Sequence, residues 1–150
     1  MSGSAPPAAR PATRPATRPA TRPATGRAPA GGVPQRQQFI WIDCNPHAGT
    51  EMRDLHPMLV LSPGAFNERT GLVIGLPVIT AAYNANNPFA LAVGAAGAAQ
   101  RSKTNYVLCH QPKSFDWRAL GAKPHRKGRL SDELFAQACA GLNQIILLGP

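Results

Sequence analysis

Proline at every fourth position is the feature that most restricts how the first part of this chain can fold. Residues 10–25 repeat Arg-Pro-Ala-Thr four times. A proline inside a helix removes a backbone hydrogen bond and clashes with the preceding turn, so this spacing rules out a helix. The segment also lacks large apolar side chains whose burial would offset the entropy lost on ordering. We therefore predict that residues 1–36 form a disordered tail with polyproline II character, and that residues 37–150 form one globular domain.

Short apolar runs bounded by Pro, Gly and Asn indicate β-strands in the domain. Pro77 places one of these runs at a sheet edge or at a bulge, because proline cannot donate a hydrogen bond to the ladder. Strands this short predict a mainly β, α+β domain built as a small, strongly twisted barrel. The runs cover residues 39–42, 58–61, 71–79, 89–93 and 106–109.

A change of period near the C-terminus predicts one helix, which we expect to pack on one side of the barrel. Ser131 is a suitable N-cap, and the acidic side chains of Asp132 and Glu133 suit the positive end of a helix. The dipeptide Gly-Pro at positions 149–150 would end it. Apolar residues recur on one helical face at Leu134, Ala138, Leu142 and Ile145.

The charge of the domain is concentrated in its second half. Residues 37–150 carry ten basic and seven acidic residues, which gives 10 − 7 = +3. Between Arg101 and Arg129 there are eight basic residues and a single acid, Asp116. This asymmetry favours an anionic partner, either nucleic acid or an acidic peptide, although a solvated basic face explains the charges equally well.

The rest of the composition points to the cytoplasm and gives no sign of a cofactor. Cys44, Cys109 and Cys139 are odd in number and no two have metal-ligand spacing, so we interpret them as small buried side chains in a reducing compartment. No apolar run approaches the ~20 residues of a membrane span, and the N-terminus lacks the apolar region of a secretory signal. We therefore expect a cytoplasmic protein with no membrane partner, no bound metal and no cofactor.

Two segments carry a resemblance to a known family. The first runs from Trp41 to Pro63 and reads as a strand, a polar loop and a second strand entered through a proline. The second, residues 111–123, reads Gln-Pro-Lys-Ser-Phe-Asp-Trp-Arg-Ala-Leu-Gly-Ala-Lys. Over residues 37–148 the chain resembles the MazF/PemK family of small bacterial toxins. The resemblance implies an SH3-like barrel of about five to seven strands with a C-terminal helix.

The resemblance also implies an activity and partners. Members of the family are metal-independent endoribonucleases that are opposed by an antitoxin. Attack by the ribose 2′-hydroxyl requires a base, an acid and a cation or hydrogen-bond donor for the phosphate. By resemblance, the chain is a homodimeric toxin that cleaves single-stranded RNA in a basic groove. An antitoxin would inhibit it by laying an acidic segment along that groove, and the complex of the two would bind operator DNA.

The chain departs from the family at several positions where the chemistry is expected. His56 stands where the family typically has an arginine, just before the proline of the second strand. His110 stands where some relatives have an acid, and Leu108 stands where those relatives have an arginine. The family favours a pair of Thr or Ser residues after the proline of the third strand, and this chain has Ile79 and Thr80 there.

Eight candidate site residues follow from this comparison. The loop acid of the family is present as Glu51, and two basic residues are placed to replace the missing arginine. The catalytic candidates are His56, His110, Glu51 and Thr80, and the RNA-binding candidates are Arg53, Arg69, Lys113 and Arg118.

Three hypotheses of function stay open. In the first, His56 and His110 form a rewired acid–base pair, because histidine titrates near neutrality and serves in either role. In the second, the site is degenerate and the chain binds antitoxin, RNA or promoter DNA without cleaving. In the third, the chain is a toxin directed at gyrase, because a gyrase-inhibiting toxin shares this fold and fold alone does not determine function.

Three further residues have both a structural and a functional interpretation. Trp117 is either part of a stacking platform for an unpaired base or the closure of the bottom of the barrel, and we favour the second. His47 lies in the same loop as Glu51, and we interpret it as a solvated loop residue. His125 lies in a basic stretch that we interpret as a loop leading to the last strand.

Overall fold

The computed structural model describes residues 31–43, 55–95 and 103–147. The repeat of residues 10–25 lies outside these ranges. Close to the start of the described residues, Val33 packs against a buried core, and the carbonyl oxygen of Pro34 accepts a 2.7 Å hydrogen bond from Asn67 Nδ2. Within the described ranges, no helix has both the length and the apolar character that crossing a membrane requires.

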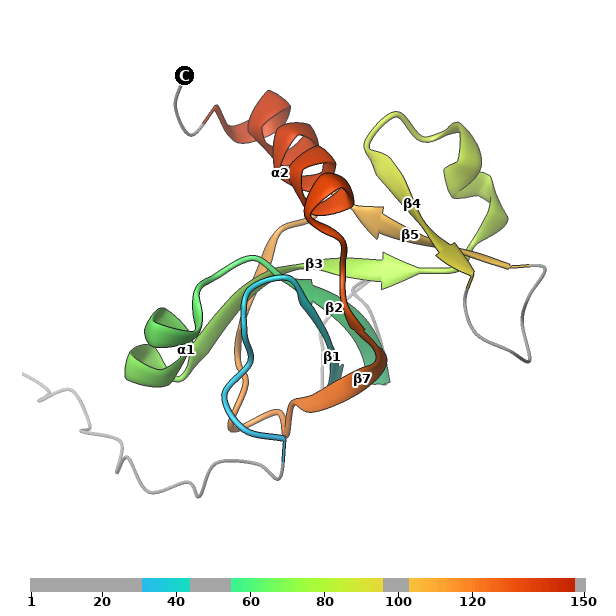
Figure 1. The fold of residues 1–150 in the computed structure, drawn as a ribbon. Coiled ribbons are helices and arrows are strands. Elements are labelled where there is room, and N and C mark those ends of the chain that lie inside the picture. The colour runs from blue at the N-terminus through green and yellow to red at the C-terminus, as the bar shows by residue number, and fades with distance from the viewer. Residues whose placement is uncertain (1–30, 44–54, 96–102, 148–150) are drawn as a thin grey trace, which may run out of the picture.

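The described residues form one curled antiparallel sheet of seven strands with helices around it (Figure 1). Across the sheet the strand order is β4-β5-β3-β2-β1-β7, and β6 pairs with β3. The predicted mainly β fold with a C-terminal helix is therefore confirmed. The strands are β1 (Gln38–Asp43), β2 (Leu55–Val60), β3 (Leu72–Ile79), β4 (Ala90–Ala95), β5 (Thr104–Leu108), β6 (Lys113–Asp116) and β7 (Lys123–Arg129). The helices are α1 (Gly64–Thr70), the 3₁₀-helix η1 (Ala82–Asn86) and α2 (Asp132–Ile146).

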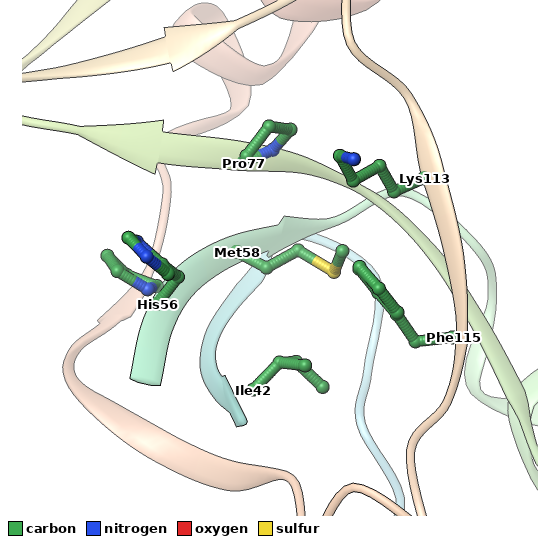
Figure 2. A pocket seen from close by; sticks show the side chains of 7 residues that line it. Ile42, His56, Met58, Pro77, Lys113 and Phe115 are labelled. Carbon is green, nitrogen blue, oxygen red and sulfur yellow. The ribbon is translucent and has the colours of Figure 1, made fainter. Parts of the chain in front are cut away.

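Alternating side chains of the same strands fill two cores, one on each face of the sheet. Inside the curl, Ile42 of β1 meets Met58 of β2 in a cluster that contains the fully buried Trp117 (Figure 2). On the other face, Phe39 and Leu59 belong to a second cluster that α2 covers. The second cluster consists of Phe39, Leu59, Leu76, Val78, Val93, Val107, Cys109, Leu130, Phe135 and Ala138.

Strand β3 lies in the middle of the sheet. One side of it pairs with β2, and the other side pairs first with β6 and then with β5. Pro77 is opposite Met58 of β2 and lies between the β6 and β5 ladders, so the missing N–H interrupts neither of them. Of the two predicted alternatives, a sheet edge or a bulge, the edge was therefore wrong, because β3 has partners on both sides. Gly75 allows β2 to approach closely, because a Cβ at Gly75 would overlap the carbonyl oxygen of Leu59.

Helix α1 is short, and a buried asparagine anchors it to the sheet. The side chain of Asn67 donates to the carbonyl oxygen of Pro34 at 2.7 Å and accepts from Ser62 Oγ at 2.5 Å. The carbonyl oxygen of Asn67 accepts a 2.8 Å hydrogen bond from Trp117 Nε1. The helix ends at Gly71, whose φ of 71° is the left-handed conformation that glycine adopts without strain.

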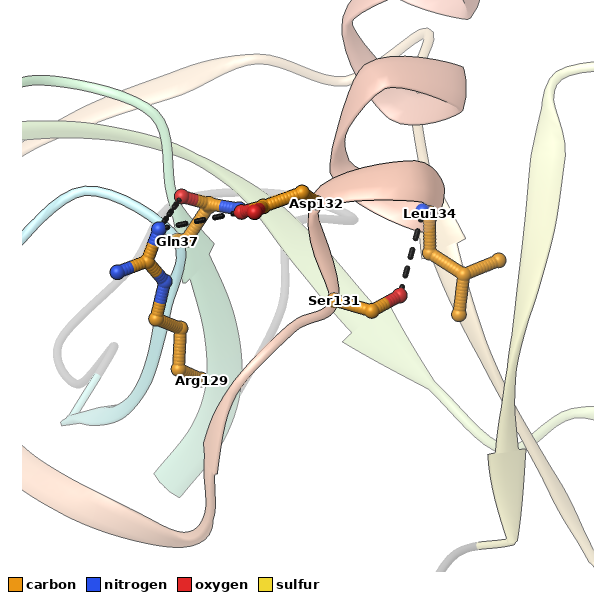
Figure 3. Close-up of polar contacts among 5 residues, drawn as sticks. All are labelled: Gln37, Arg129, Ser131, Asp132 and Leu134. Atoms are coloured by element: carbon orange, nitrogen blue, oxygen red, sulfur yellow. Dashed lines mark hydrogen bonds and ion pairs between the residues drawn. The ribbon is translucent and has the colours of Figure 1, made fainter.

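The start of α2 contains the predicted cap and a polar network that the sequence did not indicate (Figure 3). Ser131 Oγ accepts from the backbone N–H of Leu134 at 3.4 Å, which confirms Ser131 as the N-cap. Asp132 accepts hydrogen bonds from Gln37 Nε2 at 2.7 Å and from Arg129 Nη2 at 3.2 Å. Arg129 also donates to Gln37 Oε1. The hydrogen bond from Gln37 and the charge of Arg129 lower the pKa of Asp132.

The buried face of α2 is rotated from the predicted one. Ala138 and Leu142 are buried as expected, but Phe135 is the third buried residue of the helix. Leu134 is only partly buried and Ile145 is 42% exposed. The predicted face was wrong at Ile145 because Phe135, not Leu134, is the large residue that enters the second core.

Candidate active site

A pocket opens on the inner face of the sheet, at strands β1, β2, β3 and β6. Figure 2 shows Met58 at its centre, with His56 on one side and Lys113 on the other. His56 and Lys113 are the two lining residues whose side chains carry polar groups, while the surface of the pocket itself is apolar. The pocket is small and is lined by Ile42, His56, Pro57, Met58, Pro77, Lys113 and Phe115.

Strand geometry explains why two residues far apart in the sequence reach the same pocket. His56 lies two positions before Met58 in β2, so both side chains point to the inner face. In the β1–β2 hairpin, His56 is paired with Ile42 and is half-buried. Lys113 begins β6 and is paired with Gly75 of β3, which carries it to the same face from the opposite direction.

His56 and Lys113 provide complementary chemistry. An imidazole donates or accepts a proton near neutral pH, and an ammonium group stabilises the charge that develops on a phosphate in a transition state. Apolar walls with a few convergent polar groups are typical of small-molecule and substrate sites. The arrangement therefore suits acid–base chemistry on a phosphate ester.

Thr80 lies at the same end of the sheet as His56. It directly follows β3 and is exposed. Continuing the β2–β3 register beyond the pair of Met58 with Pro77 brings His56 level with Ile79, next to Thr80. Thr80 therefore follows β3 at the end of the sheet where His56 lies, and it does not line the pocket.

The loop candidates Glu51, Arg53 and His47 lie outside the described residues. The ends of the segment that carries them are described. The β1–β2 hairpin closes with the pair of Asp43 and Leu55, and Leu55 directly precedes His56. The chain therefore leaves the sheet and returns to it beside the pocket.

His110 lies in the turn between β5 and β6, where its neighbours differ from those of His56. Its ring centroid is 5.9 Å from that of Phe89, and its Nε2 is 3.3 Å from Gln111 Nε2. Its Nδ1 is buried and has no hydrogen-bond partner among the described residues. The two histidines do not line the same pocket, so the structure of one protomer does not bring this candidate pair together.

Arg69 and Arg118 lie at the other end of β3, with helix α1. Arg69 is exposed in the last turn of the helix. Arg118 Nη2 donates to the carbonyl oxygen of Glu68 at 2.8 Å, and its guanidinium lies 5.0 Å from the ring centroid of Trp117. Arg118 is therefore engaged in holding α1 against the core. Of the four RNA-binding candidates, Lys113 is the one that lines the pocket.

Trp117 is fully buried in the inner core, which confirms its interpretation as a structural residue. The interpretation of His125 as a loop residue was wrong, because His125 belongs to strand β7. Its ring centroid lies 4.5 Å from that of Trp41, and its Nδ1 accepts a 3.0 Å hydrogen bond from the backbone N–H of Lys127. Burial and the charges of Lys127 and Arg126 lower the pKa of His125 below its usual 6.5.

The lowered pKa of His125 predicts that the domain loses stability in mild acid. The fold holds His125 in its neutral form, whereas the unfolded chain takes up a proton at a higher pH. The free energy of unfolding should be greatest above pH 6.5 and should decrease as the pH falls from 6.5 towards the lowered pKa. Urea unfolding on both sides of this pH measures the change. His125→Gln, which keeps an acceptor for Lys127 but does not titrate, should remove part of the pH dependence. An identical dependence in both proteins would contradict the assignment.

The described residues contain no group of three or more His, Cys, Asp or Glu side chains that would hold a metal ion. Cys109 and Cys139 are free thiols. Cys109 is buried, and its burial together with the nearby Cys139 raises its pKa. The apolar floor of the pocket was absent from the sequence-based list of site residues. No local pattern reveals it, because Pro77 and Phe115 come together only through strand pairing.

Comparison with known proteins gives a consistent result. Residues 35–146 match the family described as "PemK-like, MazF-like toxin of type II toxin-antitoxin system". The chain is 31% identical over 114 residues to "Endoribonuclease toxin MazF" of Escherichia coli K12, which covers 76% of this chain and 95% of that protein. It is 32% identical over 108 residues to "Endoribonuclease PemK" of Escherichia coli, covering 71% and 78%.

Solved structures agree with the sequence relatives. MazF from Deinococcus radiodurans superposes with a TM-score of 0.66 at 29% identity, covering 77% of this chain and 98% of that one. A MazE–MazF complex from the same organism contains a chain with a TM-score of 0.62 at 25% identity, covering 78% and 98%. The pocket, the fold and the sequence relatives lead to one conclusion: the chain belongs to the family of PemK-like, MazF-like toxins of type II toxin–antitoxin systems.

Proposed function

We propose that this toxin is an endoribonuclease that cleaves single-stranded RNA without a metal ion. The observation that carries the proposal is the meeting of His56 and Lys113 in one pocket with an apolar floor. The names of the two sequence relatives, both endoribonucleases, support the same activity. The net charge of +9 for the whole chain favours an anionic substrate.

In this reaction, the ribose 2′-oxygen attacks the adjacent phosphorus and the bond to the 5′-oxygen breaks. The products are a 2′,3′-cyclic phosphate and a 5′-hydroxyl. One side chain removes the proton of the 2′-hydroxyl and another protonates the leaving oxygen. We assign one of these roles to His56 and assign charge stabilisation on the phosphate to Lys113. Thr80 is a hydrogen-bond donor at the end of the sheet where His56 lies, and Glu51 is the candidate for the second proton transfer.

We further propose that the active form is a homodimer and that its regulatory partner is an antitoxin with an acidic segment. Solved structures named as complexes of MazE with MazF support an antitoxin partner. Acidic side chains would compete with RNA for the same cations, which explains inhibition without a change in the fold. Operator DNA, bound by the complex of toxin and antitoxin, remains part of this proposal.

One observation favours a second candidate function, a toxin fold that binds but does not cleave. His56 replaces an arginine, and imidazole offers fewer donors and less charge to a phosphate than a guanidinium group does. In that case the chain would bind its antitoxin, RNA or promoter DNA while leaving RNA intact.

A single assay separates the two functions. Purified protein incubated with total RNA in EDTA should produce fragments with 2′,3′-cyclic phosphate and 5′-hydroxyl ends, because the proposed chemistry uses side chains alone. Ligation of the 5′ ends after phosphorylation measures these products. Cleavage that EDTA abolishes and magnesium restores would contradict the mechanism. Intact RNA that nevertheless shifts in a binding assay would support the non-cleaving alternative.

A further inference from the structure

The outer face of strands β1 and β7 carries an aromatic pair that the pocket does not use. The ring centroids of Trp41 and His125 are 4.5 Å apart, with an interplanar angle of 42°. Both side chains are half-buried, so part of each ring faces solvent. Trp41 is adjacent to Ile42 in β1, and neighbouring side chains of a strand point to opposite faces. Because Ile42 lines the pocket, this pair lies on the other face of the sheet.

The orientation of His125 is fixed. Its Nδ1 accepts the backbone N–H of Lys127 at 3.0 Å, so in the neutral ring the proton is on Nε2. The side chain of Lys127 is directed to Phe39, with its Nζ 5.7 Å from the centroid of that ring. The result is a preorganised planar group that keeps its place without a ligand.

Exposed cations flank the aromatic pair. Lys123 and Arg126 of β7 are both exposed, and the strand contains no acidic residue. Asp132 is the nearest acid that follows β7 in the chain, and Arg129 already pairs with it at 3.2 Å. Asp43, at the end of β1, also has an interaction partner. The positive charge of Lys123 and Arg126 is therefore not neutralised by an acid of their own strand.

The first described residue of the chain also lies against β7. Gly31 is so close to this strand that a Cβ there would overlap the ring of Pro124. The sequence before Gly31 contains five arginines and no acid, so its net charge is positive and adds to the attraction of an anionic ligand.

We propose that Trp41, His125, Lys123 and Arg126 form a second RNA-binding surface, separate from the pocket. The occupant is single-stranded RNA, held by stacking of an unpaired base on the aromatic pair and by phosphate contacts with the cations. A duplex keeps its bases stacked inside, so it cannot use the aromatic pair. The surface would hold the strand without reading its sequence, while the pocket performs the cleavage. The biological role of this surface rests on the proposed ribonuclease function, whereas its ability to bind RNA does not depend on that function.

Intrinsic fluorescence tests the stacking. The chain has two tryptophans, and Trp117 is fully buried, so quenching by a stacked base reports on Trp41. The probe is a 2′-O-methyl oligouridylate, which lacks the attacking hydroxyl and cannot be cleaved. Titration should quench Trp41 in the wild type and equally in His56→Ala. Absence of quenching despite binding would overturn the proposal. If duplex DNA displaced the probe as well as single-stranded RNA does, base stacking would be overturned as a source of affinity. The binding would then come from the positive charges alone.

Substitutions separate the contributions to affinity, measured by anisotropy of the end-labelled probe. Trp41→Ala should weaken binding at least roughly fivefold, whereas Trp41→Phe should retain it, because phenylalanine still stacks. Arg126→Gln should lower the slope of log affinity against log salt by about 0.7. Lys103→Gln, which removes an exposed cation just before β5, across the sheet from β7, is the matched control and should change neither quantity.

Two outcomes would contradict this surface. One is equal loss of affinity in Arg126→Gln and Lys103→Gln, which would mean that net charge acts without a defined location. The other is unchanged affinity in both Trp41→Ala and Arg126→Gln, with thermal unfolding showing both variants folded. If Trp41→Ala fails to fold, the affinity of Arg126→Gln for the probe tests the surface by itself. Because the probe cannot be cleaved, failure of the ribonuclease assay would not change any of these results.

Discussion

The variant His56→Ala should cleave RNA about 10²-fold more slowly than the wild-type chain, or slower still, which is the usual contribution of a general acid or base. His56 lines the pocket, and its replacement by alanine removes the one imidazole among the described lining residues. The side chain that we assign to proton transfer is then missing. Affinity for RNA should change little, because the ammonium group and the outer surface remain. Single-turnover cleavage of a labelled oligoribonucleotide measures the rate, and anisotropy with the non-cleavable probe measures the affinity.

His110→Ala is the matched control for this prediction. It also removes one histidine from a family site position, but its ring packs near Phe89 rather than in the pocket. We expect its rate to stay within a few-fold of the wild type. Equal losses in His56→Ala and His110→Ala would restore the acid–base pair that the sequence indicated and would require the two rings to meet between protomers. An inactive wild type that becomes active on His56→Arg would instead establish the non-cleaving alternative.

Sequence reasoning located the parts of the fold that carry a strong local signal. The apolar runs around Leu59 and Leu76 became buried strands, because a run of β-forming residues needs a sheet to bury it. Ser131 capped α2 as expected, since the side-chain oxygen of a cap acts within one helical turn. In both cases, residues close together in the chain determine the outcome.

The elements that were missed obtain their structure from contacts distant in the sequence. Strand β7 reads Lys-Pro-His-Arg-Lys-Gly-Arg, and its basic composition gave no strand signal. It is held by its pairing with β1. Lys127 of β7 packs over Phe39 of β1, and His125 packs against Trp41. Helix α1 has only seven residues, and it is held by the buried Asn67 rather than by a periodic apolar face.

In the candidate site, too, individual residues could be identified from the sequence, but contacts between distant segments could not. The resemblance identified His56 and Lys113 separately, but spacing in the sequence cannot show that they share a pocket. That depends on the register of β2 and β6 against β3. The turn after β5 carries His110 beside Phe89 and away from the pocket that His56 lines, so the action of the two as an acid–base pair stays a prediction. The positions of Glu51 and Arg53 lie outside the described residues, so their roles stay predictions.

Trp117 has more than one stabilising interaction at the centre of the inner core. Its side chain is fully buried among Ile40, Ile42, Val60 and other apolar residues. Its indole N–H donates to a carbonyl oxygen of helix α1 at 2.8 Å. This one side chain therefore connects the β6–β7 turn, the inner sheet face and α1, which explains why it stands within the family signature although it does not contact the open pocket.

Trp117→Ala should lower the free energy of unfolding by roughly 3–5 kcal/mol, the usual cost of removing a buried aromatic ring, because it opens a cavity and removes one of the two donors to the carbonyl oxygen of Asn67. Urea unfolding followed by circular dichroism measures this loss. Trp41→Ala is the matched control, since it removes the same side chain from a half-buried position and should cost less. Trp117→Phe should fall between the two because it keeps a ring but not the N–H. A Trp117→Ala protein that remains as stable as Trp41→Ala but no longer binds RNA would instead make Trp117 a base-stacking residue.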